Sequence, residues 1–215
     1  MRRLAGQPPW RHGIGACRVW CGAVFAGLVA AAAAQTTPAS DDAAAHYGER
    51  FAATCVACHG EGGRSTTALT PTLAGQPSFY AITQLFLFRA GRRDNAAMSA
   101  VAHDFSDDDL RGFSDLIGRL PPAPAPGRAG RAERIGRGQA LAQRHHCDGC
   151  HGADFAGGKQ VPRIAHQRED YLAKALKEFR AGTRLGYTNA MGEALAGLTP
   201  DELDDLAHYL AHLPP

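Results

Sequence analysis

Two stretches of the sequence, CVACHG at residues 55–60 and CDGCHG at residues 147–152, place two cysteines and a histidine at one fixed spacing. Two thiols two residues apart can add to the two vinyl groups of one haem as thioethers, and the histidine that follows then ligates the iron. Each stretch therefore predicts one covalently bound haem c, with His59 and His151 as the proximal iron ligands. The predicted attachment residues are Cys55, Cys58, Cys147 and Cys150.

Two other chemistries also use closely spaced cysteines. A thioredoxin-like redox pair needs a strand–helix–strand context, which neither stretch has. The four cysteines could instead form a single Cys₄ zinc site. Three features favour haem over both: a histidine follows directly each time, each stretch is complete by itself, and the chain is expected to be exported.

A second axial ligand for each iron is predicted from the methionines. Apart from Met1, the chain has only Met98 and Met191, which follow the histidines by 39 and 40 residues, each in an expected loop before a last helix. A thioether ligand raises the reduction potential of a haem. His103 is the alternative ligand in the first half, although its counterpart in the second half is Ala196, and core packing is the alternative role for a methionine.

Further residues are expected close to the haems. A carbonyl of the turn at Pro71 or Pro162 is suited to accept the second ring N–H of its histidine, unless these are plain loop turns. Tyr80 and Tyr171 are suited either to cover a haem edge or to pack within a helical core. Arginines that could pair with haem propionates, or simply be solvated, are Arg64, Arg92, Arg93 and Arg184.

The N-terminus has the layout of a secretory signal peptide. Arginines precede an uncharged run of 16 residues, which ends in an A-x-A cleavage site at Ala32 and Ala34. We expect residues 1–34 to be removed and the mature protein to be periplasmic. The alternative is an uncleaved anchor, but a spanning helix needs about 20 residues. Cleavage removes Cys17 and Cys21, so only the motif cysteines remain.

The chain contains one domain twice. The halves align from end to end at an offset of 91 to 93 residues, which matches the haem motifs, the methionines and the LAGQ segment with IAHQ. The segment PPAPAPGRAG between them favours an extended, semi-rigid connection. We therefore expect a first domain at residues 35–121, a linker at 122–130 and a second domain at 131–215.

Both halves are expected to be helical. Residues 80–89 and 171–180 space their apolar side chains by three and four positions, and glycines follow as stop signals. Thr199, with Pro200 and Glu202 after it, indicates the start of a final helix. No stretch alternates convincingly as a strand, so the predicted fold class is all-α, with a few helices wrapped around a covalent haem in each half. Further expected helix positions are a start at Ser106 and helices at 43–54 and 132–144.

The sequence resembles bacterial di-haem cytochromes c of the cytochrome c4 type. The resemblance lies in the paired C-x-x-C-H-G stretches, the P-x-L-A-G-Q run, the tyrosine that opens the next helix, the F-x-x-G-x-R ending and the later methionine, and it covers about residues 41–215. It implies two tandem class I cytochrome c domains. It also implies axial ligation by the pairs His59 with Met98 and His151 with Met191.

The resemblance further implies an electron carrier rather than an enzyme. Its partners would be redox proteins: a respiratory donor, such as a quinol-oxidising complex, and a terminal oxidase or other acceptor. A haem-bearing subunit of a periplasmic dehydrogenase and, further off, a di-haem peroxidase are the alternatives. A net charge of +2 without a block of like charges gives no sign of nucleic-acid binding. Membrane association is not expected through a spanning helix once the signal is removed.

Two segments depart from the family pattern. The second half reads RIAHQ at residues 163–167, where the family tends to repeat LAGQ, and the first half has the unusual loop STTALTPTLAG at residues 65–75. Neither contains an expected ligand, but both are positioned to alter haem exposure or the choice of partner.

Overall fold

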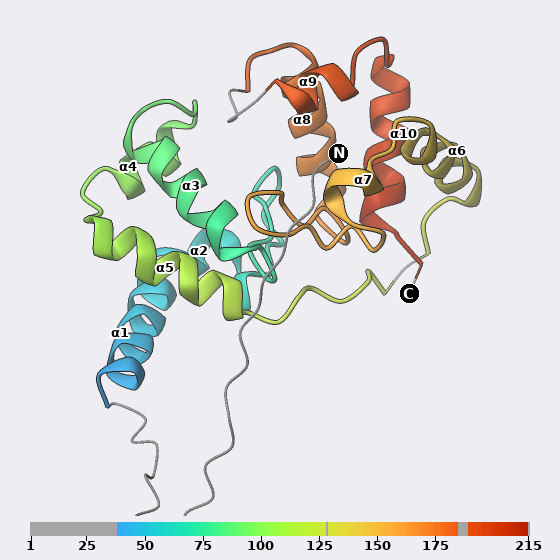
Figure 1. The fold of residues 1–215 in the computed structure, drawn as a ribbon. Helices are drawn as coiled ribbons and strands as arrows, with labels where there is room; N and C mark the ends of the chain where they lie inside the picture. Colours follow the sequence, from blue (N-terminus) through green and yellow to red (C-terminus); the bar gives the residue numbers. More distant parts are fainter. Residues whose placement is uncertain (1–37, 128, 185–188, 215) are drawn as a thin grey trace, which may run out of the picture. The chain divides into compact units, whose positions relative to one another are not determined.

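The computed structural model describes residues 38–127, 129–184 and 189–214 as helices joined by turns and irregular segments (Figure 1). Within these ranges there is no β-strand, and the only isolated bridge pairs Gly158 with Val161. The predicted all-α class is therefore confirmed. The expected signal peptide of residues 1–34 lies outside the described residues. None of the described helices combines the length and the apolar character needed to cross a membrane.

The two halves repeat one order of helices. Each has a long helix, a one-turn helix that carries the Cys/His motif, a middle helix, a short helix that carries a methionine, and a final helix. The first half comprises α1 (Pro38–Thr54), α2 (Val56–His59), the 3₁₀ turn η1 (Glu61–Gly63), α3 (Ser78–Arg89), α4 (Ala96–Ala102) and α5 (Asp107–Arg119). The second half comprises α6 (Ala132–Arg144), α7 (Asp148–His151), α8 (Glu169–Arg180), α9 (Ala190–Ala194) and α10 (Pro200–Ala211).

Each half has its own hydrophobic core. In the first half α5 packs against α1 and α3, and Phe113 at its centre is 2% exposed. In the second half α10 packs against α6 and α8, and Leu203 is fully buried. Between the cores, the described residues of the segment 120–131 form no helix. The bounds of the two domains, 35–121 and 131–215, stay a prediction.

Most helix ends follow from local sequence. Thr199 accepts a hydrogen bond from the backbone N–H of Glu202, whose carboxylate accepts one in return, so the predicted capping box is present. Ser106 forms the same reciprocal pair with Asp109 at the start of α5. Gly91, just after α3, has a φ of 62°, the left-handed conformation in which a helix commonly ends. The helices at 80–89 and 171–180 exist as predicted, each beginning two residues earlier.

The methionine segments are helical, so the expected loops before the last helices were wrong. Met98 lies in α4, whose sequence AAMSAVA is rich in alanine, the strongest helix former. The side chain of Asn95 caps this helix by accepting a hydrogen bond from the N–H of Met98 at 2.9 Å. Met191 lies in the shorter α9. In α4 a good cap and alanine propensity therefore outweigh the loop-like composition of the flanking residues.

We expect acid to weaken the contact between α1 and α5 through Asp109. Its carboxylate pairs with Arg50 of α1, and the hydrogen bond from this guanidinium lowers the pKa of Asp109 to about 2, against the opposing effect of burial. Because the folded pKa lies below the ordinary value of 3.8, the stabilisation is complete above about pH 4 and is lost as the pH falls through 2. Asp109→Asn should lower the free energy of unfolding by about 1–2 kcal/mol at pH 7.

Urea unfolding measured between pH 2 and pH 7 tests this expectation. The variant should lose less stability than the parent on acidification below pH 4. Asp108→Asn is the matched control, because Asp108 is the preceding, exposed residue of the same helix and, among the described residues, forms an ion pair with Arg111 alone. Parallel stability curves for the parent and Asp109→Asn would contradict the assignment.

Candidate haem-binding sites

The Cys/His motifs lie on single turns of helix. In the first half the N–H of His59 donates to the carbonyl of Cys55 at 2.8 Å, and in the second half the N–H of His151 donates to Cys147 at 3.0 Å. On such a turn the first cysteine, the second cysteine and the histidine occupy positions i, i+3 and i+4, which lie on one face of a helix. The spacing of the motif therefore presents two thiols and an imidazole on one side, as attachment to a single flat cofactor requires.

The glycine that follows each histidine has a structural role that the sequence analysis did not assign. Gly60 has a φ of 75° and Gly152 a φ of 82°. A Cβ at Gly60 would lie 2.2 Å from the carbonyl oxygen of Arg64, so only glycine fits. The chain thus turns back sharply after the histidine and leads toward the proline segment.

Both histidines are buried and oriented by a backbone carbonyl. Nδ1 of His59 lies 2.8 Å from the oxygen of Pro71, and Nδ1 of His151 lies 2.9 Å from the oxygen of Pro162. A carbonyl can only accept, so Nδ1 carries the proton and the Nε2 lone pair is left for a metal. Burial lowers the pKa of both rings, against the opposing effect of these hydrogen bonds, which favours the neutral, ligating form. The expected contact with the proline turn is confirmed.

The cysteines do not fit the two alternative chemistries. None of the four forms a disulfide, and burial raises the pKa of Cys55 to about 11 and that of Cys147 above its ordinary value. A reactive redox C-x-x-C has a lowered thiol pKa instead. Within the part of the chain that the structure describes, no close group of metal-ligating side chains includes a cysteine, so the Cys₄ zinc site is not formed. Cysteines that form no disulfide with one another fit covalent attachment of haem.

Each methionine borders the core of its own half. Met98 packs on the core cluster that Cys55 also borders, and Met191 packs on the cluster that Cys147 borders. The rival ligand His103 has a side chain that is 78% exposed, with Nδ1 2.7 Å from Asp104. This placement favours Met98 over His103. The axial assignment of both methionines stays a prediction.

A buried group of two arginines and two tyrosines joins the halves. The side chain of Arg184, only 6% exposed, donates to the hydroxyl of Tyr171 at 3.1 Å and to that of Tyr80, in the other half, at 3.4 Å. Arg93 of the first half donates to the hydroxyl of Tyr171 at 2.9 Å. Two of the arginines and both of the tyrosines that were expected near the haems therefore lie together at the contact between the halves. The other two candidate arginines, Arg64 and Arg92, are exposed.

This group carries more positive than negative charge. Among the described residues, the only carboxylate within 4.0 Å of either guanidinium is that of Glu178, 3.8 Å from Arg184. Burial alone would raise the pKa of Tyr171, but the two guanidinium groups outweigh it and lower that pKa to about 8. Two poorly compensated cations, of which Arg184 is buried, fit the carboxylates of haem propionates, which would pair with them.

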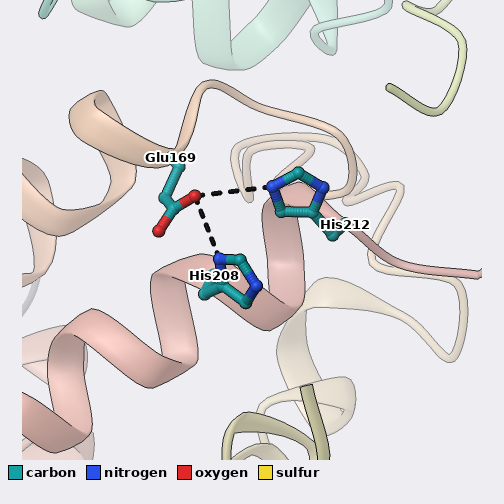
Figure 2. A group of neighbouring side chains, drawn as sticks. All are labelled: Glu169, His208 and His212. Atoms are coloured by element: carbon teal, nitrogen blue, oxygen red, sulfur yellow. Dashed lines mark ion pairs between the residues drawn. The ribbon is translucent and has the colours of Figure 1, made fainter. Parts of the chain in front are cut away.

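A second polar group, absent from the sequence-based expectations, lies between α8 and α10 (Figure 2). One carboxylate oxygen of Glu169 lies 3.0 Å from Nδ1 of His208 and 3.4 Å from Nε2 of His212. Nε2 of His208 accepts a hydrogen bond from the N–H of Arg131 at 2.8 Å, so its ring proton is on Nδ1, the atom that faces Glu169. Arg134 also pairs with Glu169 at 3.0 Å. The group therefore fits an internal ion-pair network that holds the start of α6 rather than a metal site.

Comparison with known proteins finds relatives that are similar to this chain over most of its length. Residues 42–115 match the family model described as cytochrome C oxidase, cbb3-type, subunit III, and residues 135–214 match that described as cytochrome c. The chain is 33% identical to a cytochrome c4 of Thiocapsa roseopersicina, over 74% of this chain and 86% of the relative. It is also 33% identical to a thiosulfate dehydrogenase electron acceptor of Thiomonas intermedia, over 76% and 80%. The solved structure of reduced cytochrome c4 from Pseudomonas stutzeri aligns with a TM-score of 0.73 and 26% identity, over 80% of this chain and 98% of that one.

Proposed function

Because the chain belongs to the cytochrome c4 family of di-haem cytochromes, we propose that it is a periplasmic protein that carries single electrons between respiratory redox partners. It holds two haem c groups, one in each half, each attached covalently through the cysteine pair of its motif. One-electron exchange between ferric and ferrous iron is the chemistry that these groups supply. The chain itself determines ligation, potential and access.

The proposed ligands are His59 with Met98 in the first half and His151 with Met191 in the second. The observation that carries the proposal is that each half presents a buried histidine with Nδ1 bonded to a proline carbonyl, and a methionine on the same core as its attachment cysteine. These residues would fill the iron positions on both faces of each haem and would leave none open to oxygen or peroxide. This supports a carrier over a peroxidase, whose catalytic iron needs an open site.

Four further residues orient the histidines or pair with the haem propionates. Pro71 and Pro162 hold the histidine rings in the ligating tautomer through their carbonyl oxygens. Arg93 and Arg184 would pair with propionate groups and keep their charge from destabilising the interior. Both roles hold the residues around the iron in one arrangement in the ferric and in the ferrous state. A small structural change between the two states keeps the reorganisation energy of electron transfer low.

The donor of the electrons has a second candidate beside a quinol-oxidising complex. Relatives from Thiomonas intermedia and Stutzerimonas stutzeri, 33% and 34% identical, are described as thiosulfate dehydrogenase electron acceptors. The same arrangement in this chain would serve an electron acceptor of a periplasmic dehydrogenase equally well. Both roles require the same chemistry, and only the partner differs.

Optical and magnetic spectra of the purified protein test the carrier function. We expect low-spin ferric spectra for both haems, two one-electron reduction steps and no consumption of hydrogen peroxide. A high-spin ferric signal from one haem, together with peroxide turnover, would favour the peroxidase instead. Mixing the oxidised protein with a reduced quinol-oxidising complex or with a thiosulfate dehydrogenase, and comparing the rates of haem reduction, separates the two donors.

The periplasmic location needs its own test. The mature protein should be recovered in the soluble periplasmic fraction and should begin at Gln35, after the cleavage site at Ala34. Recovery in the membrane fraction with residues 1–34 still present would show that the segment is retained as an anchor.

A further inference from the structure

Two glutamines at equivalent positions of the repeat reach across from one half to the other. Gln76 ends the LAGQ segment and Gln167 ends the IAHQ segment. Their exposed fractions are 7% and 6%, so both amides are buried and must find hydrogen-bond partners there. Neither has a role in the proposed electron carrier so far.

Each glutamine pairs with both backbone groups of one residue in the other half. Oε1 of Gln167 accepts from the N–H of Thr72 at 2.7 Å, while its Nε2 donates to the oxygen of Thr72 at 2.8 Å. Oε1 of Gln76 accepts from the N–H of Arg163 at 3.1 Å, and its Nε2 donates to the oxygen of Arg163 at 2.8 Å. Since Thr72 and Arg163 are also equivalent positions, the contact is reciprocal, as expected when two copies of one domain meet through the same surface.

The backbone groups that the glutamines bind belong to the peptides that orient the histidines. The N–H of Thr72 and the carbonyl of Pro71 are the two ends of one planar peptide group. That carbonyl accepts from Nδ1 of His59 at 2.8 Å, while the N–H donates to Gln167. The same chain of contacts runs in the other direction, from His151 through the peptide after Pro162 to Gln76.

We propose that each glutamine tunes the iron of the opposite half: Gln167 acts on the first haem through His59, and Gln76 on the second through His151. The inference rests on the proposed function, because it requires these histidines to be iron ligands. Both glutamines are positioning residues that act through a peptide and a histidine, since neither has a place in the ligand sets.

The physical basis is mutual polarisation along a chain of hydrogen bonds. A peptide whose N–H donates to an acceptor has a more negative carbonyl oxygen, and each further bond strengthens its neighbour by roughly 10–30%. A stronger bond from Nδ1–H to that oxygen makes the histidine a better electron donor to the iron. Ferric iron is then favoured, and the reduction potential falls. Loss of the glutamine should therefore raise the potential of the haem in the other half.

This arrangement links the two redox centres without any shared ligand. The relays cross the contact between the halves, so a change at that contact, such as the docking of a partner, alters the donor strength of both histidines together.

Gln167→Leu tests the relay with the complete di-haem protein. Reduction is followed at fixed electrode potentials by NMR, with the resonances of each haem assigned through contacts to its attachment segment, which holds Val56 in the first half and Asp148 in the second. We expect the ferrous-to-ferric ratio of the first haem to rise about threefold, which at 59 mV per tenfold change is ~30 mV. The second haem should change less. Gln76→Leu should give the mirror result.

Two further variants separate tuning from a looser contact between the halves. Asp170→Ala removes another cross-half hydrogen bond, from the N–H of Leu69 at 3.0 Å, but leaves the relay intact, so it should leave both potentials nearly unchanged. Gln167→Glu keeps an acceptor for Thr72 and makes it charged, hence stronger, and should lower the potential of the first haem. A general loosening would shift the potential in the same direction for Leu and Glu.

The inference is overturned if Gln167→Leu shifts the haem of its own half more, shifts both equally, or shifts neither. It is also overturned if Asp170→Ala reproduces the shift. A failure of the proposed function would be seen in a different experiment. The optical and magnetic spectra of the unsubstituted protein would then show an iron that is not low-spin. Exchange of the Thr72 N–H with solvent gives a readout independent of the iron, and it should be faster in Gln167→Leu than in the parent.

Discussion

Met98→Ala is expected to remove the weak far-red ferric absorption band of the first haem alone and to lower the reduction potential of that haem by a few tenths of a volt. Thioether ligation stabilises ferrous iron, and axial ligands set haem potentials over a range of roughly 0.8 V. The vacated position would admit water, so the first haem should also become partly high-spin. Visible spectra recorded during a potentiometric titration measure all three changes in one experiment.

Two controls make this result specific. Met191→Ala should give the same changes in the second haem and spare the first. His103→Ala should change neither haem, because this side chain is 78% exposed and paired with Asp104. If His103→Ala removed the band and Met98→Ala did not, the assignment of the first distal ligand would pass to the histidine.

Gly138→Ala is expected to lower the free energy of unfolding by about 2–3 kcal/mol. Gly138 lies on α6 where this helix crosses α10, and a Cβ there would lie 2.4 Å from the carbonyl oxygen of Asp205 and 2.5 Å from the Cβ of Tyr209. Neither atom can rotate away, so the two helices must separate and loosen the core of the second half. Urea unfolding followed by circular dichroism measures the loss.

The same helix contains a matched control. Gly136, two residues earlier, is exposed and has no atom within 4 Å of the added Cβ. Gly136→Ala should raise the free energy of unfolding by up to about 1 kcal/mol, because alanine is the better helix former. Opposite signs for the two substitutions isolate the helix crossing from helix propensity. A neutral Gly138→Ala would mean that α6 and α10 adjust without loss of packing.

The two departures from the family pattern both lie at the contact between the halves. In the IAHQ segment, His166 takes the place of Gly75 and has a φ of 56°, a conformation that few residues other than glycine adopt. The ring of His166 reaches the oxygen of Leu213 at 3.1 Å. In the unusual loop of the first half, the N–H of Leu69 donates to Asp170. Gln76, which follows the loop, and Gln167, which ends the IAHQ segment, are both present, and with them both proposed relays.

Several features were decided by residues close together in the sequence. The Cys/His motifs specify one turn of helix with three groups on one face, and the boxes at Thr199 and Ser106 specify helix starts. These signals depend on backbone hydrogen bonds between near neighbours, so they can be read without knowledge of the rest of the fold. Because the domain is duplicated, the Cys/His motif and the helix-start signal each occur twice. Two haems and an all-α fold could therefore be predicted.

Other features required the tertiary structure. The contact of Gln167 with Thr72 joins residues 95 positions apart, and that of Arg184 with Tyr80 joins residues 104 positions apart. The sequence singled out Tyr80 and Arg184, and also the two segments that contain Gln167 and Thr72. It could not pair them, since no local pattern states which surfaces of two similar domains meet. The helical setting of Met98 was also missed, because the cap at Asn95 and the alanine run were weighed as loop. Local hydrogen bonding therefore determined the helical turns that carry the Cys/His motifs, while packing between the halves decided how the two halves are connected.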